Sequence, residues 1–256
     1  MLSLDDILNA RQRLANHLTP TPLELANGLG DGVWLKLENA NLTHSFKIRG
    51  ALNAVLSLDD DARQRGLVTA SSGNHAQGLA YAAHLTGARA RILMPKHTPK
   101  RKVNGVQRYG AEAVLFGDNY DESEVEALRL ARDEGMTFVS AYSDPRVIAG
   151  AGTIGLEIVD SLPDVERVVV CVSGGGLISG VALAVKSRKP EVEVIGVNAE
   201  SAPAMYNLFY DSDLPQVWDT LAEALSGDID ADSVTRPMTR QYVDRIVLVS
   251  EAQIAD

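Results

Sequence analysis

The stretch L-V-T-A-S-S-G-N-H-A-Q-G, residues 67–78, reads as a strand, a turn and the beginning of a helix. Residues 67–71 are apolar or small and include β-branched side chains, which predicts a buried strand. Small polar residues follow, and the apolar spacing over 74–86 predicts a helix. A strand that turns directly into a helix is the repeating unit of a parallel α/β sheet.

The same alternation continues along the chain. Segments long enough for crossover helices, such as 74–86 and 122–134, separate most of the predicted strands. One group of strands lies near 67–140 and another begins at about 165, so we predict two α/β lobes, each an open, mainly parallel sheet flanked by helices. The predicted strands are 33–37, 67–71, 90–94, 113–116, 167–172, 192–197 and 245–249.

Composition narrows the class of protein. The 256 residues carry a net charge of −10 and no run of Lys or Arg, so we expect no nucleic-acid partner. No apolar run reaches membrane-spanning length, and the first fourteen residues predict an amphipathic helix rather than a signal peptide. The single cysteine, Cys171, excludes a disulfide within the chain and favours a cytoplasmic location. Because it lies in V-V-V-C-V, we expect a buried thiol.

A lysine stands at the start of another predicted helix, in N-L-T-H-S-F-K-I-R-G, residues 41–50. Apolar residues recur at helical spacing after Lys47, and Ser45 is placed to cap the first turn. The positive end of a helix and burial both favour a neutral amine. Two interpretations stay open: a surface lysine whose stem covers Phe46, or a Schiff-base lysine with partners elsewhere.

Two strands end in loops of small residues. V-S-G-G-G-L-I-S-G, residues 172–180, predicts a phosphate-binding turn at a helix N-terminus, with a ligand-free tight turn as the alternative. Ser179 replaces the last glycine of the dinucleotide fingerprint, but Glu200 lies near the spacing expected for a ribose contact, so a dinucleotide site stays a rival. The loop at 71–75 offers four polar side chains, which suit a carboxylate or phenolic oxygen. Its alternative is an ordinary helix cap by Ser72 or Asn74.

A lysine amine, a phosphate-binding turn and a small-anion loop together match the needs of pyridoxal phosphate. The five histidines show no metal-ligand spacing, and no G-x-S-x-G nucleophile motif is present.

S-F-K-I-R-G, S-S-G-N-H-A-Q-G and S-G-G-G-L occur in this order, and the chain resembles the fold-type II pyridoxal-phosphate enzymes of the threonine dehydratase and serine racemase group. Further similarity runs through 144–158 and 194–206, so the resemblance covers essentially the whole chain. It implies a tryptophan synthase β-like fold. A large cofactor-binding domain would comprise 1–65 and 144–256, and a small domain 66–143.

The resemblance also implies roles for single residues. Lys47 would form the internal aldimine and act as the base at Cα, and Ser72 would be the acid/base on the second face. Phe46 would flank the ring and Asn74 would bind its phenolic oxygen. The remaining implied contacts are the substrate carboxylate with Ser71, Ser72 and His75, and the phosphate with Ser173, Gly174, Gly175, Gly176 and Leu177.

The implied reaction is α,β-elimination from L-threonine or L-serine, which yields a 2-oxo acid and ammonia. Serine racemase is one alternative, and a non-catalytic pyridoxal-phosphate-binding pseudo-enzyme is another. The expected partner is a small hydroxy amino acid, and the family implies a homo-oligomer, either dimer or tetramer.

Several positions depart from the family pattern. His44 and Ala224 replace residues that are usually glycine. Glu200 and Ala204 match the start of a cation site of racemases, but Tyr206 replaces its last carboxylate, so we predict no firm metal site. The chain also stops several dozen residues before the family does. We therefore expect an incomplete large domain and a chain that is poorly stable and weakly active, or inactive, by itself.

Overall fold

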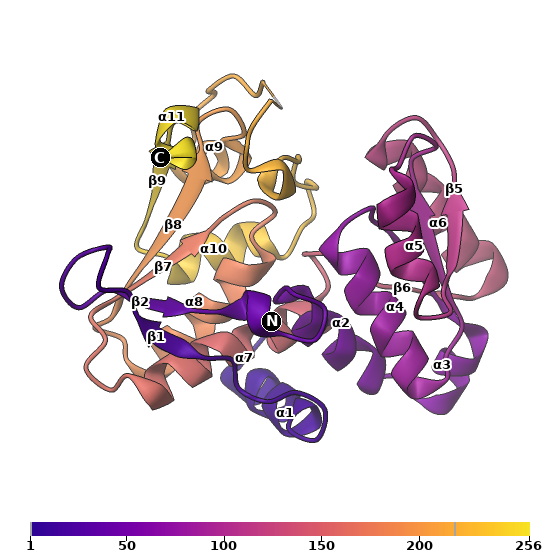
Figure 1. Ribbon diagram of the computed structural model, residues 1–256, viewed down its shortest axis with the longest axis horizontal. Coiled ribbons are helices and arrows are strands. Elements are labelled where there is room, and N and C mark those ends of the chain that lie inside the picture. The colour runs from indigo at the N-terminus through magenta and orange to yellow at the C-terminus, as the bar shows by residue number, and fades with distance from the viewer. Residues whose placement is uncertain (1, 218) are drawn as a thin grey trace. The chain divides into compact units, whose positions relative to one another are not determined.

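The computed structural model describes residues 2–217 and 219–256, which divide into two compact units (Figure 1). One unit combines Met1–Leu8 with Tyr142–Asp256, and the other runs from Asn9 to Ala141. Helix α1 (Leu4–Leu14) contributes to both, because the division falls within it. Each unit contains its own parallel sheet, which confirms the predicted α/β class.

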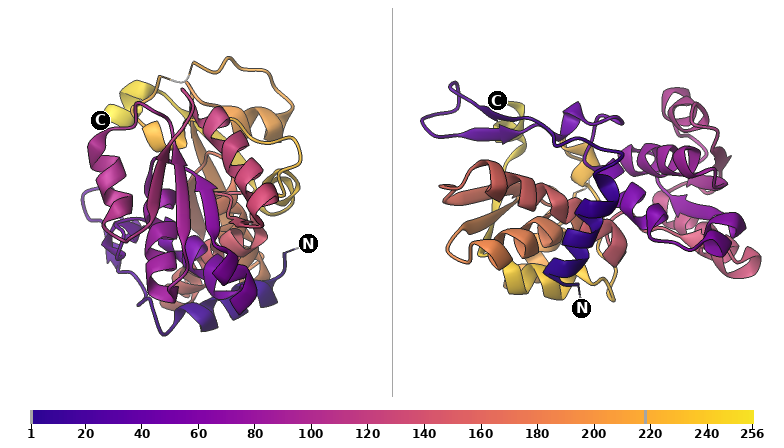
Figure 2. Two further views of the ribbon diagram at one scale, coloured as in Figure 1. Left: turned by 90° about the vertical axis from the view of Figure 1, so that its right-hand side faces the viewer. Right: turned by 90° about the horizontal axis from the view of Figure 1, so that it is seen from below.

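The unit from Asn9 to Ala141 contains a short antiparallel hairpin and a four-stranded parallel sheet. The strand order in the larger sheet is β5-β4-β3-β6, so β3 lies between neighbours on both sides. Figure 2 shows these strands side by side with helices on either side of them. The elements of the unit from Asn9 to Ala141 are β1 (Leu23–Leu25), β2 (Trp34–Lys36), a 3-10 turn (Glu38–Ala40), α2 (Lys47–Leu56), α3 (Asp60–Arg65), β3 (Leu67–Ala70), α4 (Asn74–Thr86), β4 (Ala90–Met94), α5 (Lys100–Gln107), β5 (Glu112–Leu115), α6 (Tyr120–Glu134) and β6 (Thr137–Phe138).

Local chemistry explains where these elements begin and end. All four residues of β3 are buried, as expected for a central strand of a parallel sheet. Helix α4 ends at Gly87, which adopts the left-handed conformation at φ 69° that glycine tolerates best. Helix α6 begins after Asn119, whose side chain accepts a hydrogen bond from the backbone N–H of Glu122.

The second unit has a three-stranded parallel sheet in the order β7-β8-β9. Helices α7 and α8 pack backbone to backbone: a Cβ at Gly180 would lie 2.4 Å from the carbonyl oxygen of Ile148, so only glycine fits there. The elements of this unit are α7 (Pro145–Ser161), β7 (Arg167–Cys171), α8 (Gly176–Arg188), β8 (Glu193–Ala199), α9 (Ala204–Tyr210), a 3-10 turn (Glu223–Leu225), α10 (Thr235–Tyr242), β9 (Arg245–Val249) and α11 (Glu251–Ala255).

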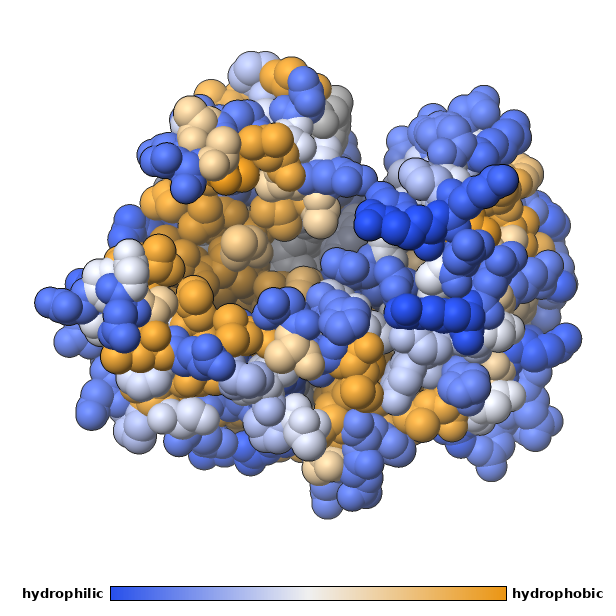
Figure 3. Space-filling model, in the orientation of Figure 1, coloured by the Kyte–Doolittle hydropathy of each residue, from blue (hydrophilic) through white to orange (hydrophobic). Residues whose placement is uncertain are grey.

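The expectation of a buried Cys171 is wrong, because the thiol is exposed. Strand β7 alternates: Val168 and Val170 are buried, whereas Val169 is 63% exposed and lies on the same face as the cysteine. Figure 3 shows hydrophobic surface over this sheet. The continuous apolar run predicted the strand correctly. The expectation that both of its faces are buried was wrong, because one face of β7 is exposed.

Two further sequence predictions concern the domain boundaries and the presence of membrane-spanning helices. The predicted domains, 1–65 with 144–256 and 66–143, stay a prediction; the compact units place residues 9–65 together with the strands up to residue 141. No helix in the described ranges combines the length and apolar character that crossing a membrane requires.

Candidate functional site

Lys47 is the first residue of α2, as its sequence context predicted. Its Nζ donates a hydrogen bond to the carbonyl oxygen of Ala141 at 2.8 Å and lies 5.1 Å from the centre of the Phe46 ring. Burial lowers the pKa of the Lys47 amine from 10.5 to about 8, because the charged form loses hydration. A much larger fraction of this amine is therefore neutral and nucleophilic near pH 8 than for an exposed lysine.

The loop before Lys47 has an unusual backbone. His44 adopts the left-handed conformation at φ 57°, and its N–H donates to the carbonyl oxygen of Asn41 at 2.8 Å. Side chains other than glycine rarely adopt this region, which gives a physical reason for the family's glycine at this position. The flanking hydroxyls of Thr43 and Ser45 are buried and make no hydrogen bond within the described part of the chain. The predicted Ser45 cap is therefore wrong: Phe46 is the cap residue, and no side chain bonds there.

A buried ion pair fixes this loop to α2. Arg49, which is 2% exposed, donates from Nε and Nη2 to the two carboxylate oxygens of Glu38 at 2.8 and 2.9 Å. The same carboxylate accepts hydrogen bonds from Thr21 at 2.6 Å and Asn41 at 2.8 Å. This cluster was missed in the sequence analysis, because an arginine two positions after Lys47, in the first turn of a helix, is usually exposed to solvent.

The loop at 71–75 follows β3 directly. The backbone N–H of Gly73 donates to the Ser71 hydroxyl at 3.2 Å, and Gly73, not Ser72 or Asn74, is the cap residue of α4, so the alternative of an ordinary side-chain cap is wrong. The side-chain polar groups of Ser72 and Asn74 make no hydrogen bond to other described residues, and Asn74 is exposed. These two side chains are available to a ligand.

His75 differs from its neighbours in this loop. Its side chain is 2% exposed, and Nε2 lies 3.0 Å from the carbonyl oxygen of Val139. This geometry ties the ring to the segment after β6. The predicted contact of His75 with a substrate carboxylate is not tested by it and stays a prediction.

The position of Lys47 and of the 71–75 loop follows from the strand order. The chain runs from β3 outward to β4 and β5 and then returns to β6 on the other side of β3, so the order reverses between β3 and β6. Ligands of open α/β sheets bind at the carboxyl ends of strands at such a reversal. Residues 139–141 leave β6 there, and their carbonyl oxygens accept hydrogen bonds from Thr69 and from the side chains of His75 and Lys47.

Gly78 brings the lysine helix against the loop helix. A Cβ on Gly78 of α4 would lie 3.2 Å from the carbonyl carbon and oxygen of Lys47. The absence of a side chain thus lets α4 rest directly on the backbone that carries the lysine. The glycine in the quoted 67–78 stretch was the available signal, but its contact could not be assigned from sequence.

The glycine loop belongs to the other unit, between β7 and α8. Within the described chain, the backbone N–H groups from Ser173 to Leu177 donate no hydrogen bond to protein atoms. Gly175 has φ 84°, and a Cβ on Gly174 would lie 2.6 Å from the Tyr142 ring. Successive free N–H groups at a helix N-terminus suit an anion such as phosphate, and the close ring explains the glycine.

The region of the doubtful metal site contains no suitable cluster. Glu200 is exposed after β8, Ala204 begins α9, and the Tyr206 ring packs against Tyr210 at 4.7 Å between ring centres. Among the residues that the structure describes, no three His, Cys, Asp or Glu side chains are grouped to hold a metal ion. Ala224, the other departure from the family pattern, lies exposed in the 3-10 turn Glu223–Leu225.

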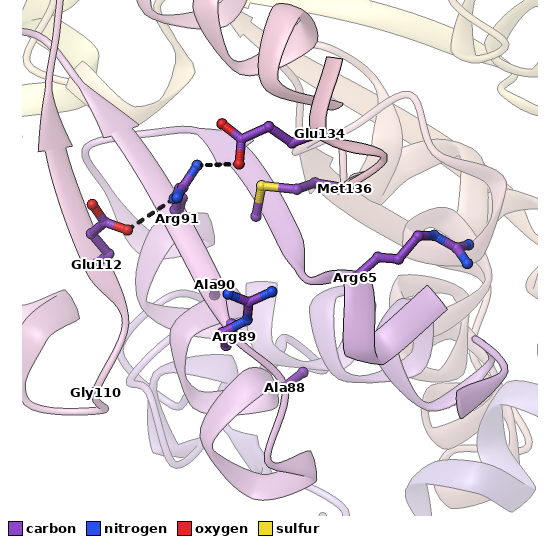
Figure 4. A pocket seen from close by; sticks show the side chains of 9 residues that line it. All are labelled: Arg65, Ala88, Arg89, Ala90, Arg91, Gly110, Glu112, Glu134 and Met136. Carbon is purple, nitrogen blue, oxygen red and sulfur yellow. Dashed lines mark hydrogen bonds and ion pairs between the residues drawn. The ribbon is translucent and has the colours of Figure 1, made fainter. Parts of the chain in front are cut away.

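A separate pocket of about 290 Å³ lies at the amino ends of the larger sheet's strands (Figure 4). Arg91 projects between Glu112 and Glu134 and pairs with them at 2.9 and 2.6 Å. The remaining lining residues include Arg65, Arg89 and Met136. No residue predicted for the site lines this pocket, so it is distinct from the lysine and its loop.

A family model described as "pyridoxal-phosphate dependent enzyme" matches residues 14–256. The chain belongs to this family. The match spans both units, so it covers the lysine, the polar loop and the glycine loop together. The predicted family and its pyridoxal-phosphate cofactor are thereby confirmed.

Two curated relatives share more than two fifths of their aligned residues with this chain. The chain is 45% identical to L-threonine ammonia-lyase of Thermotoga maritima, where the match covers 100% of the chain and 65% of the relative. It is 41% identical to the catabolic L-threonine dehydratase TdcB of Escherichia coli K12, over 99% of the chain and 78% of the relative. The chain thus spans about two thirds to four fifths of these proteins.

Solved structures in the family have the same fold. Maize serine racemase superposes with a TM-score of 0.93 at 31% identity, covering 100% of this chain and 79% of that one. The processed form of threonine deaminase isoform 2 from Solanum lycopersicum superposes with a TM-score of 0.87 at 35% identity, covering 96% and 69%. These matches confirm the predicted fold-type II architecture.

Proposed function

We propose that this chain carries out the chemistry of a pyridoxal-phosphate-dependent L-threonine/L-serine ammonia-lyase, which forms a 2-oxo acid and ammonia by α,β-elimination. The observation that carries the proposal is the Lys47 amine, whose pKa is lowered to about 8 by burial at the sheet's reversal point. The relatives named L-threonine ammonia-lyase and L-threonine dehydratase, at 45% and 41% identity, support the same reaction.

The residues fit the cofactor that the family uses. The amine of Lys47 would attach it covalently, and the open N–H groups of residues 173–177 would bind its phosphate. Phe46 would lie against the ring, and the exposed Asn74 amide would donate to the phenolic oxygen. When bound, the cofactor supplies an electron sink that stabilises negative charge at the substrate's Cα.

The chain's own groups would hold the substrate and move the protons. Ser71, Ser72 and His75 would bind the substrate carboxylate at the start of α4, where the helix dipole favours negative charge. The Lys47 amine would remove the Cα proton. Overall, the β-hydroxyl would leave with a proton as water, and hydrolysis would return one water and release the amino group as ammonia, so that the 2-oxo acid and ammonia together balance the starting amino acid.

Serine racemase activity is the second candidate. The Ser72 hydroxyl makes no hydrogen bond to other described residues and could return a proton to the opposite face of Cα. The superposition with maize serine racemase is compatible with this activity. A non-catalytic chain that only binds pyridoxal phosphate is the third candidate.

We propose further that the protein is a cytoplasmic homo-oligomer, a dimer or tetramer, with the domain boundaries predicted from its sequence. The single cysteine supports a reducing compartment, and the exposed apolar side chain of Val169 supports further burial on assembly. Light scattering of the purified protein measures the oligomeric state directly.

The proposed function is tested by adding pyridoxal phosphate to the purified chain and recording its yellow absorbance. We expect colour in the wild type and in Lys100→Ala, which replaces an exposed lysine that is also the first residue of a helix. Lys47→Ala should stay colourless. A folded wild type without colour, or a coloured Lys47→Ala, would overturn the proposal.

Products distinguish the three functions. Incubation with L-threonine, L-serine and D-serine should give 2-oxo acid from the L-substrates if the chain is an ammonia-lyase. Inverted serine without 2-oxo acid would favour the racemase, and colour without any product would favour the non-catalytic protein.

A further inference from the structure

Thr235 contacts the glycine loop from a distant part of the chain. This residue begins α10 and is 0% exposed, and its hydroxyl donates to the carbonyl oxygen of Gly174 at 2.7 Å. The Ser233 hydroxyl lies 2.8 Å from the Thr235 hydroxyl. Because the single proton of Thr235 is given to Gly174, Ser233 must be the donor in that second bond. A buried chain of two hydroxyls thus ends on one backbone carbonyl.

The orientation of this carbonyl determines where the next N–H group points. A trans peptide is planar, so the Gly174 carbonyl and the Gly175 N–H point in opposite directions. A peptide between two glycines can rotate at low cost, because neither residue has a side chain that resists it. By binding the Gly174 carbonyl, the Thr235 hydroxyl therefore keeps the Gly175 N–H pointing away from α10, together with the other free N–H groups of residues 173–177.

Other contacts enclose the same turn. A Cβ on Gly175 would lie 2.5 Å from the Met205 side chain and 3.0 Å from the Thr235 Cβ. The Tyr142 ring lies against Gly174, and its hydroxyl donates to the carboxylate of Asp230 at 2.5 Å. Residues 230–235 therefore support the loop in two ways: the Thr235 hydroxyl binds it directly, and Asp230 accepts a hydrogen bond from Tyr142, whose ring lies against Gly174.

We propose that Thr235 is a positioning residue for the phosphate group of the cofactor. It would act without contacting the phosphate itself, by fixing the Gly174–Gly175 peptide with the N–H toward a phosphate monoester. This inference rests on the proposed function, since it assumes that residues 173–177 bind the phosphate of pyridoxal phosphate.

The experiment compares pyridoxal phosphate with pyridoxal, which carries the same aldehyde but no phosphate. Equilibrium dialysis gives a dissociation constant for each compound. The ratio of the constant for pyridoxal to the constant for pyridoxal phosphate isolates the contribution of the phosphate group. Thr235→Val removes the hydroxyl and keeps the shape. We expect it to reduce the ratio about tenfold, the order of one well-placed hydrogen bond, by weakening pyridoxal phosphate alone. Thr235→Ser retains the hydroxyl and should restore the ratio.

Thr239→Val is the matched control, because Thr239 lies on the same helix, is 0% exposed, and pairs with Ser179 instead of the loop. It should leave the ratio unchanged. If Thr235→Val does not fold, Ser233→Ala takes its place and should lower the ratio in the same direction. An unchanged ratio in the folded variant, or an equal loss of both ligands, overturns the inference.

The outcome for the wild type separates the two proposals. A wild type that binds neither compound overturns the proposed function and this inference with it. A wild type that prefers pyridoxal phosphate, combined with an unaltered ratio in Thr235→Val, overturns the inference alone.

Discussion

The amine of Lys47 loses its proton more readily in the folded chain than in the unfolded one, since burial lowers its pKa from 10.5 to about 8. Between these pH values the folded chain has lost the proton and the unfolded chain still holds it. The free energy of unfolding must therefore rise with pH across that window, and below pH 8 the cost of burying the ammonium is fully present.

Lys47→Met removes this titration, so we predict that its stability curve is flatter than that of the wild type from pH 8 to 10.5. Other groups contribute equally to both proteins and cancel in the difference, which should amount to about 3 kcal/mol over the window. Urea unfolding of the cofactor-free proteins at several pH values measures it. Parallel curves would show that the amine is not buried.

The pairing of Arg49 with Glu38 links the loop at 38–46 to the helix that carries the lysine. Removing one partner leaves the other charge buried, which costs about 3–5 kcal/mol. We predict a loss of this order in Arg49→Met, measured by denaturant unfolding. Arg91→Met is the matched control, because Arg91 also pairs with carboxylates but at the surface. It should lose less than about 1 kcal/mol, and equal losses would contradict a special role for the buried pair.

At the scale of elements, the packing of α4 on α2 depends on Gly78. Valine at this position would push its side chain into the backbone of Lys47, because even a Cβ would lie 3.2 Å from it. We predict that Gly78→Val destabilises the unit by about 1–3 kcal/mol, as overpacking usually does, and weakens covalent attachment of pyridoxal phosphate. Thermal unfolding and the yellow absorbance measure the two effects.

Gly105→Val is the control for that substitution. Gly105 is also helical, but the three atoms nearest to an added Cβ there all belong to the Gln77 side chain, which can move away. Its stability and its colour should stay close to those of the wild type. Comparable damage in both variants would mean that valine in a helix, rather than the contact with Lys47, is responsible.

Sequence periodicity located most elements of the molecule. Helix α4 spans Asn74–Thr86 as predicted, and strand β9 spans Arg245–Val249 as predicted, because both depend on local patterns. A capping box at the start of α11, with Ser250 and Gln253 bonded in both directions, is a local feature of the same kind. Such features arise from neighbours within a few positions and need no knowledge of the rest of the chain.

The remaining features depend on partners far apart in the chain. Strand β6 has two residues, Thr137–Phe138, too few for a pattern, yet it creates the reversal of strand order beside β3. Arg49 and Thr235 act through contacts 11 and 61 residues away, which no local pattern reports. The chemical residues of the candidate site could therefore be predicted by motif, whereas the groups that hold them in place could not.

At the scale of the whole molecule, the hydrogen bond from Lys47 to Ala141 joins residues 94 positions apart. A ribosome releases the lysine long before it releases its carbonyl partner, since synthesis proceeds from the N-terminus. During that interval the newly made helix can dock on α4, but the amine has no backbone acceptor at residue 141. The nucleophile's final environment is therefore completed only when the last strand of its sheet has been made, so a half-synthesised chain cannot yet present the amine in its finished setting.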